Sequence, residues 1–269
     1  MTDWVVVLLF LVLGASLGSF LGMCVSRIGS ILGSKHKLSI SLFSGRSLCD
    51  NCKNKLKWWE NAPIISFLIL KGRCRNCHSP IPFWYLLIEL TTAAAFLFTF
   101  FYWRNNFVSF GFINVLVLLI FLLISLLLIF VIFFDYQFLI IPDEIIISLL
   151  ALAVIFKTIV GFSIVNFYSA IGSFVFLFFL FFLTKGKGMG FGDVKYVFFM
   201  GLFLGWPSTL VSFYLAFLTG SFVGVIMILL KKAKIKQKIA FGPFLVYGTF
   251  VSWWWGEAVF RTVLKWLNI

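Results

Sequence analysis

Long stretches of apolar residues dominate this chain of 269 residues. The stretch from Trp4 to Cys24 is long enough to cross a bilayer, and comparable stretches recur toward the C-terminus. Hydrophobic residues make up 62% of the chain and charged residues 12%, against about half and about a quarter in a soluble domain. One soluble core cannot bury so much apolar surface. We therefore expect an all-α protein that crosses the membrane many times.

The apolar stretches predict about eight transmembrane helices. Their expected ranges are 4–26, 83–103, 111–134, 142–161, 164–183, 193–206, 208–230 and 242–266. No small-residue cleavage site follows the first stretch, so we expect it to remain as a membrane helix. Three regions result: a first transmembrane helix (1–26), a polar loop (27–82) and a helical membrane domain (83–269).

The net charge of +13 comes from basic residues that cluster between the apolar stretches. In a soluble protein such a charge would favour nucleic-acid binding, but here we expect no nucleic-acid partner. The loop 27–82 contains ten Lys and Arg residues, and five lysines lie between 231 and 238. The positive-inside rule places both segments on the cytoplasmic side of the bilayer. The lysine run is interpreted as a topology signal, with a lipid-binding or partner-binding patch as the alternative.

Two of the nine acidic residues, Asp135 and Asp193, fall where different membrane helices are expected to meet the cytoplasmic face. Carboxylates at membrane depth are costly and usually serve a function. Two that lie close together share a proton, so one acts as general base toward water while the other donates to the scissile carbonyl. The pair predicts an aspartyl peptidase. The alternative for each residue alone is a helix cap or a solvated interfacial carboxylate.

Glycines lead into the second aspartate in the sequence Gly188-Met189-Gly190-Phe191-Gly192-Asp193. Because glycine has no Cβ, Gly190 and Gly192 leave room for a substrate backbone. A single Gly-x-Gly-Asp motif is weak when it stands alone. The motif is informative here because both aspartates are expected at the cytoplasmic face of the membrane.

Three other acidic residues have open interpretations. Asp143 and Glu144 lie in the first turn of an expected helix, where they stabilise the helix dipole. Alternatively, Asp143 supports the site near Asp135. Glu89 lies inside the expected helix 83–103, and we expect it to face the helix bundle, although no partner can be read from the sequence.

The loop 27–82 contains two Cys-x-x-Cys pairs, formed by Cys49, Cys52, Cys74 and Cys77. Two such pairs have the ligand spacing of a structural zinc site with four thiolates. A cytoplasmic loop keeps its thiols reduced, which favours zinc over disulfides. Redox work and unligated thiols are the remaining alternatives. The nearby histidines, His36 and His78, are interpreted as surface residues because four thiolates already complete the ligand set.

The order of these motifs resembles the type IV prepilin peptidase family, the leader peptidase/N-methyltransferases. The resemblance runs over nearly the whole chain. It is carried by Gly18-Ser19-Phe20-Leu21, Arg46-Ser47-Leu48-Cys49, Lys71-Gly72-Arg73-Cys74-Arg75-Asn76-Cys77, Asp135 with Pro142-Asp143, Gly190-Phe191-Gly192-Asp193 with Lys195, and Phe241-Gly242-Pro243-Phe244.

The resemblance implies that Asp135 and Asp193 are the catalytic pair, with Gly190, Gly192, Asp143 and Lys195 in support. It implies cleavage of prepilin and pseudopilin leaders after Gly, at the cytoplasmic face of the bacterial inner membrane. Whether the substrates belong to a type IV pilus, to type II secretion or to DNA uptake is left open by the motifs. Family members with a cysteine loop often also methylate the new N-terminal residue from S-adenosylmethionine. The motifs leave open which pilins are cut, where the methyl donor binds and whether the protein dimerises.

Two other classes of function are compatible with intramembrane carboxylates and a cysteine loop. A transporter or proton relay would need acidic residues near the middle of the membrane, whereas these lie at one face. A non-enzymatic scaffold of a secretion machine would use the cysteine loop for docking. Ion flux in liposomes tests the first alternative, and a probe based on aspartyl-protease inhibitors tests the second.

Overall fold

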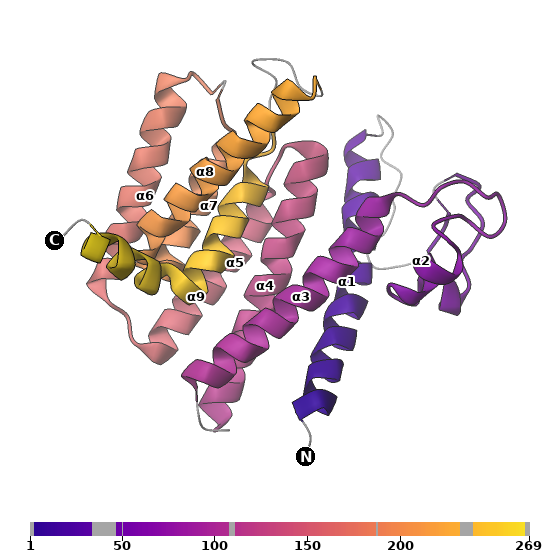
Figure 1. Cartoon of the computed structure of the whole chain (residues 1–269), viewed down its shortest axis with the longest axis horizontal. Coiled ribbons are helices and arrows are strands. Elements are labelled where there is room, and N and C mark those ends of the chain that lie inside the picture. The colour runs from indigo at the N-terminus through magenta and orange to yellow at the C-terminus, as the bar shows by residue number, and fades with distance from the viewer. Residues whose placement is uncertain are drawn as a thin grey trace. The chain divides into compact units, whose positions relative to one another are not determined.

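The structure is a computed structural model that describes residues 3–33, 47–49, 51–107, 111–186, 188–231 and 239–266. Across these residues the secondary structure is helical, apart from two isolated bridges in the loop, so the all-α prediction is confirmed. The helices are α1 (Asp3–Gly33), η1 (Trp58–Asn61), α2 (Ile65–Ile69), α3 (Phe83–Asn106), α4 (Phe112–Phe138), α5 (Asp143–Val160), α6 (Ile164–Leu183), α7 (Phe191–Leu204), α8 (Ser208–Leu229) and α9 (Gly242–Trp266) (Figure 1).

A helix lies in each of the eight ranges expected from the apolar stretches. Five of them, α1, α3, α4, α6 and α8, are long and apolar enough to cross a membrane. Of the others, α7 has only 14 residues and α5 carries three charged side chains in its 18 residues. The crossing of all eight helices therefore stays a prediction. The first helix also continues to Gly33, beyond its expected end at residue 26, because the polar residues after the apolar stretch do not stop a helix.

The chain divides into two compact units, Met1–Phe130 and Val131–Ile269. In the first unit, α1 packs along α3. Gly14 and Gly18 lie on this contact, and a Cβ built on them would come within 2.7 Å of the Ala93 Cα and 2.8 Å of the Glu89 Cα. Small residues spaced by four bring two membrane helices close together in this way.

In the second unit, the short helix α7 lies at the centre and contacts α5, α6, α8 and α9. Nine of its fourteen residues are buried, including Tyr196, whose hydroxyl hydrogen-bonds to Thr249 on α9 at 2.9 Å. Polar side chains in an apolar bundle need such partners because no water is available there. A glycine with positive φ, Gly205 at +72°, ends α7. The helix that carries Asp193 is thus fixed on several sides by its neighbours.

Candidate active site and metal centre

Asp135 lies in the last turn of α4, three residues before the helix ends. Its side chain is buried, with 5% of the residue exposed. The Oδ2 atom accepts a hydrogen bond from the backbone N–H of Gly242, the first residue of α9, at 2.9 Å. A Cβ at position 242 would lie 2.7 Å from that oxygen, so the close approach needs glycine. The apolar stretch predicts an end of this helix at residue 134, but α4 continues to Phe138 and carries Asp135 inside it.

Asp193 is the third residue of α7 and is equally buried, at 5% exposed. The helix begins at Phe191, two residues before its expected start, and Gly190 is the N-cap. The Oδ2 atom of Asp193 reaches back to accept the Gly190 N–H at 3.0 Å. The carboxylate therefore does stabilise the helix start, as the capping interpretation held, but from the third position of the helix and not from the cap itself.

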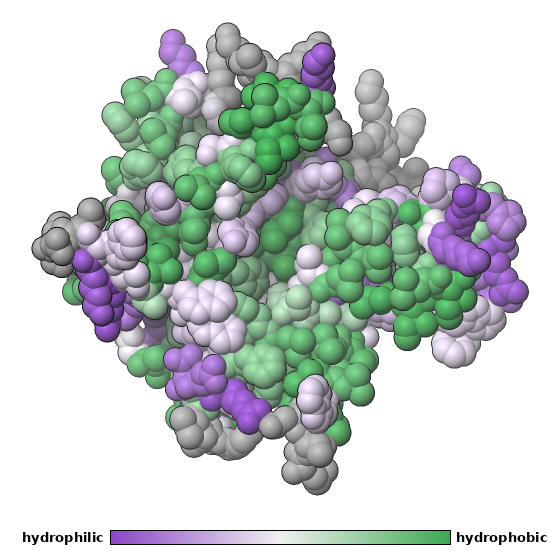
Figure 2. Space-filling view, viewed as in Figure 1, coloured by the Kyte–Doolittle hydropathy of each residue, from purple (hydrophilic) through white to green (hydrophobic). Residues whose placement is uncertain are grey.

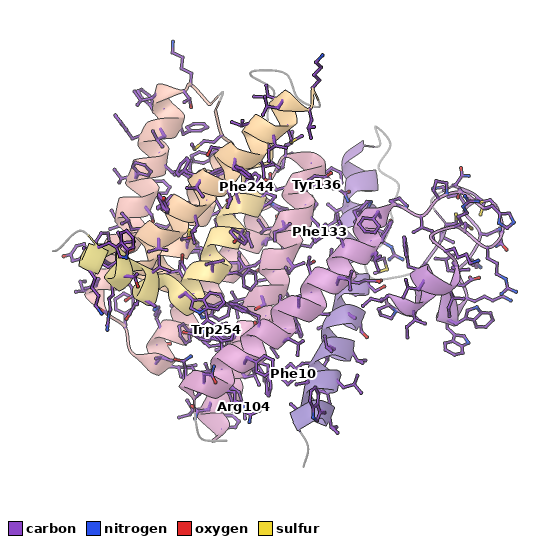
Figure 3. The ribbon with its side chains drawn as sticks, in the orientation of Figure 1. Phe10, Arg104, Phe133, Tyr136, Phe244 and Trp254 are labelled. Carbon is purple, nitrogen blue, oxygen red and sulfur yellow. The ribbon has the colours of Figure 1, made fainter. Side chains whose placement is uncertain are left out.

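A cavity of about 320 Å³ joins the two aspartates. It lies in the second unit, at the end where α4 and α6 terminate and α7 and α9 begin. Tyr136 and Phe244 lie near this end of α4 and α9 (Figure 3). The lining brings together all six residues of the predicted catalytic and supporting set, Asp135, Asp143, Gly190, Gly192, Asp193 and Lys195, with Ile141 and the segment Ile239–Phe241. Within the described residues, neither aspartate has a second hydrogen-bond partner.

The two glycines of the motif play different parts in the structure. At Gly192 a Cβ would lie 3.1 Å from the Ile141 Cβ, so this glycine allows α7 to pack against the segment before α5. At Gly190 the nearest atom to such a Cβ would be Asp193 Oδ2 at 3.5 Å, an ordinary contact. Gly190 therefore borders open cavity, whereas Gly192 is needed for packing.

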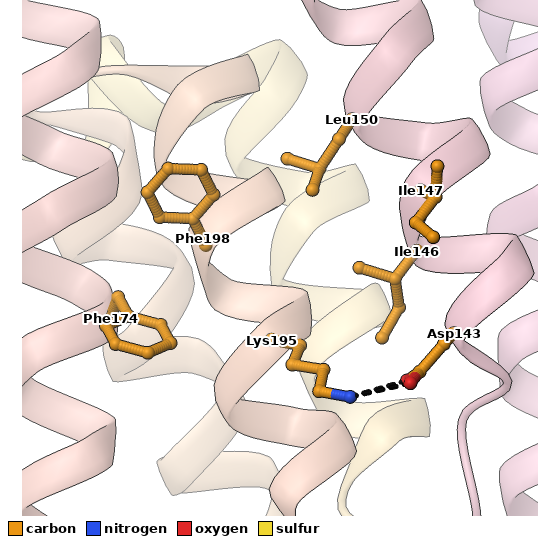
Figure 4. Close-up of a pocket in the computed structure, with 7 residues that line it drawn as sticks. All are labelled: Asp143, Ile146, Ile147, Leu150, Phe174, Lys195 and Phe198. Atoms are coloured by element: carbon orange, nitrogen blue, oxygen red, sulfur yellow. Dashed lines mark hydrogen bonds and ion pairs between the residues drawn. The ribbon is translucent and has the colours of Figure 1, made fainter.

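Asp143 and Lys195 form an ion pair at the edge of the cavity, with Lys195 Nζ 2.7 Å and 2.8 Å from the two carboxylate oxygens. The same two residues also line a second cavity of about 410 Å³, whose other walls are apolar (Figure 4). Phe174, Phe198 and Leu150 contribute to that lining from α6, α7 and α5. The pair therefore stands between the aspartate cavity and an apolar hollow.

In the first unit, the four predicted metal ligands gather in one place, with the Sγ atoms of Cys49, Cys52, Cys74 and Cys77 all within 4.8 Å of one another. Tetrahedral zinc with Zn–S bonds of about 2.3 Å separates its sulfurs by roughly 3.8 Å. The Sγ atoms of Cys49 and Cys77 are 3.9 Å apart. A cluster of four thiols this compact fits a zinc ion, and four thiolates complete its ligand set without a histidine.

Each Cys-x-x-Cys pair lies in a tight turn of the same design. The carbonyl of the first cysteine accepts an N–H four residues later, from Lys53 in one turn and His78 in the other. Both of those residues have positive φ, +56° and +57°. In the second turn, hydrogen bonds from Ser79 lower the pKa of the Cys77 thiol to about 6, which favours the thiolate that metals bind.

Three structural partners could not be named from the sequence. The first is the N–H of Gly242, although its motif was recognised. The second is the Ile239–Phe241 segment, which forms a wall of the aspartate cavity. The third is the partner of Glu89, which accepts the Ile64 N–H at 2.7 Å and also hydrogen-bonds to Ser19. Each is a backbone or long-range contact that side-chain type does not encode.

The comparisons with known proteins agree over both units. The model of the Bacterial Peptidase A24 N-terminal domain matches residues 12–104, and that of the Type IV leader peptidase family matches residues 120–225. No solved structure matches the chain significantly.

Among curated proteins, a prepilin leader peptidase/N-methyltransferase of Pseudomonas aeruginosa is 31% identical over 96% of this chain and 93% of its own. One of Legionella pneumophila is 31% identical over 84% of this chain and 77% of its own. One of Aeromonas hydrophila is 31% identical over 83% of this chain and 76% of its own. These matches cover both the cysteine loop and the helices that carry the aspartates, and the chain belongs to the prepilin leader peptidase/N-methyltransferase family.

Proposed function

We propose that this protein is a membrane-embedded aspartyl endopeptidase that cuts the leaders of type IV prepilins or pseudopilins after Gly. The observation that carries the proposal is the shared cavity of two buried carboxylates, Asp135 and Asp193, contributed by separate helices. The names of the relatives support the substrate class. The orientation is proposed from the distribution of charge, which places this end of the helices at the cytoplasmic face of the inner membrane.

The geometry supplies the parts of acid–base hydrolysis. In each aspartate Oδ2 already accepts a glycine N–H, so Oδ1 is available for the reacting groups. Both carboxyl groups line the same cavity. In the proposed mechanism they share one proton between them. The ionised member takes a proton from the attacking water, and the protonated member donates to the carbonyl oxygen of the scissile bond.

The cavity walls favour an extended polypeptide as the substrate. Gly190 borders the cavity without a side chain, which leaves room for a substrate strand to pass close to α7. Ile239–Phe241 and Ile140 supply apolar surface on other sides.

We further propose that the four cysteines hold a structural zinc ion and that the protein methylates the new N-terminal residue from S-adenosylmethionine. Four thiolates leave zinc no open position, so the ion would fold the loop and take no part in chemistry. Within the described residues we assign no site to S-adenosylmethionine, and methyl transfer rests on the names of the relatives.

The proposal is tested by replacing each carboxylate with its isosteric amide. In Asp135→Asn and Asp193→Asn the amide oxygen still accepts the glycine N–H, so the fold should be kept while the shared proton is lost. We expect leader cleavage to fall by roughly 100-fold or more in each, measured on purified prepilin by mass spectrometry. The matched control is Glu257→Gln, because Glu257 lies near the far end of α9 and pairs with Arg261 at 3.3 Å. Normal processing by either Asn variant would reject the assignment.

A further inference from the structure

The cysteine loop is attached to the side of the membrane helices and not only to their ends. The backbone N–H of Ile64, in the loop, donates to Glu89 Oε2 at 2.7 Å. Glu89 is the seventh residue of α3, about 9 Å along the axis from the start of the helix. It also hydrogen-bonds to Ser19, inside the candidate span Trp4–Gly29 of α1. Ile64 therefore lies beside the membrane-spanning helices.

Helix α2 begins directly after Ile64 and exposes its apolar side chains. Ile65, Leu68 and Ile69 are 60%, 64% and 74% exposed, and their spacing places them on one face of the helix. The adjoining η1 contributes Trp58, which is 82% exposed. We call these four side chains the apolar patch. Figure 1 shows α2 beside the first turns of α3, and Figure 2 shows hydrophobic and hydrophilic side chains gathered on different parts of the loop surface.

Basic side chains flank the apolar patch in the sequence. Lys57 precedes Trp58, and Lys71 and Arg73 follow α2; all three are exposed. Within the described part of the chain none of the three forms an ion pair with a carboxylate. Glu60 is committed elsewhere, because it accepts the Lys57 N–H at 2.7 Å. Exposed tryptophan and aliphatic side chains bordered by cations are typical of surfaces that enter the interface of an anionic membrane.

We propose that the apolar patch inserts into the cytoplasmic leaflet of the bilayer, where Lys57, Lys71 and Arg73 bind anionic lipid headgroups. The attachment to Glu89 holds α2 at the depth where the interface of the bilayer begins. The loop is also bounded in the chain by two membrane spans, α1 and α3, so it cannot leave the surface. A prepilin is the less suitable occupant, because the leader expected for substrates of this family is basic and would be repelled by the same cations. The proposal rests on the proposed cytoplasmic orientation and is independent of the catalytic aspartates.

Photo-crosslinking of the full-length protein tests this contact. A benzophenone amino acid replaces Leu68 in one variant and Asn76 in the control. Asn76 is an exposed residue of the same loop that lies between Cys74 and Cys77, outside α2 in the sequence. Both are reconstituted in nanodiscs containing phosphatidylglycerol. We expect phospholipid adducts at position 68 at least tenfold above those at position 76. Equal yields at the two positions, or an adduct at 68 that shifts to prepilin when prepilin is added, would overturn the proposal.

The headgroup contact is tested by hydrogen exchange of the segment 65–73. We expect slower exchange in nanodiscs with phosphatidylglycerol than in phosphatidylcholine alone, and no such difference in the double variant Lys71→Gln/Arg73→Gln. An identical rate in both lipids for the unaltered protein would reject the anionic partner. Zinc content is measured beside it to confirm that the loop is folded. Neither the crosslinking nor the hydrogen-exchange measurement depends on leader cleavage. A negative result in them would therefore not affect the assignment of the two aspartates, and loss of that assignment would not affect the proposed lipid contact.

Discussion

Each candidate catalytic aspartate is held by the N-terminus of a helix. Asp193 accepts the N–H before its own helix, and Asp135 accepts the first N–H of α9. Helix N-termini carry partial positive charge, which stabilises and orients a carboxylate. Capping and catalysis had been opposing interpretations of these residues. In the structure a capping role is compatible with a catalytic one, because each hydrogen bond from a glycine N–H occupies only one oxygen of the carboxylate.

The sequence allows two roles for Asp143, stabilising a helix dipole or supporting the site, and its ion pair with Lys195 favours support. The side chains of Lys195 and Asp143 are 34% and 62% exposed, so the pair adds little to folding stability, about 0–1 kcal/mol. Both side chains line the cavity of the dyad, however. Removing Lys195 would leave Asp143 as an unpaired negative charge beside Asp135 and Asp193, which in the proposed mechanism share a proton.

We therefore predict that Lys195→Met lowers kcat/KM for prepilin cleavage by roughly tenfold, with a small change in Tm. Asp143→Asn should lower kcat/KM less than Asp135→Asn or Asp193→Asn does. The double variant Asp143→Asn/Lys195→Met should recover most of the loss, because it removes the unpaired charge. The measurement is kcat/KM for prepilin cleavage by the three variants and the unaltered protein. A double variant no better than Lys195→Met alone would contradict an electrostatic role for the pair.

At the scale of elements, the gathering of the four cysteine thiols could be predicted from spacing alone, but the turns that position them could not. Lys53 and His78 occupy the positive-φ positions after each second cysteine, where glycine would be the recognisable signal. Glycine spacing did carry information elsewhere. Gly14 and Gly18 lie four residues apart on the face of α1 that meets α3, a pattern readable in advance.

The zinc site is expected to fold the loop without serving the dyad. We predict that Cys52→Ser or Cys74→Ser releases about one zinc per chain and impairs methylation of the processed pilin more than its cleavage. Metal analysis and mass spectrometry of the pilin measure the two effects. Cys24→Ser is the matched control, because Cys24 lies in α1 outside the thiol cluster. Parallel loss of both activities in the two variants would reject this division of labour.

At the scale of the whole molecule, hydropathy predicts the positions of the long helices but not the contacts that form the aspartate cavity. Apolar stretches predict helices because each must satisfy its own backbone in lipid, and this signal is local. The contacts that build the site are not local, since Ile141 and Ile239–Phe241 reach the cavity from loops between helices. Ordinary aliphatic residues in loops carry no sequence signal of such a role.

The orientation and the crossing of the shorter helices are tested together by reporter fusions. We predict that alkaline phosphatase is active when fused after Gly161 or Gly205, the residues that end α5 and α7. Green fluorescent protein should be fluorescent when fused after Lys185 or Lys231, because basic segments stay in the cytoplasm. Phosphatase activity at Lys185 would reverse the proposed orientation. An inactive phosphatase fusion at Gly205 would mean that α7 does not cross.

The bond from the Gly242 N–H to Asp135 also sets the moment at which the site becomes complete. Ribosomes make the chain from its N-terminus, so Asp135 and Asp193 emerge before the segment Ile239–Phe241 and α9. Until α9 inserts, Asp135 lacks its donor and the cavity lacks a wall. A molecule still being translated therefore carries both carboxylates without the enclosure that would hold another polypeptide against them. It gains that enclosure only after α4 to α8 have been made and α9 has followed them.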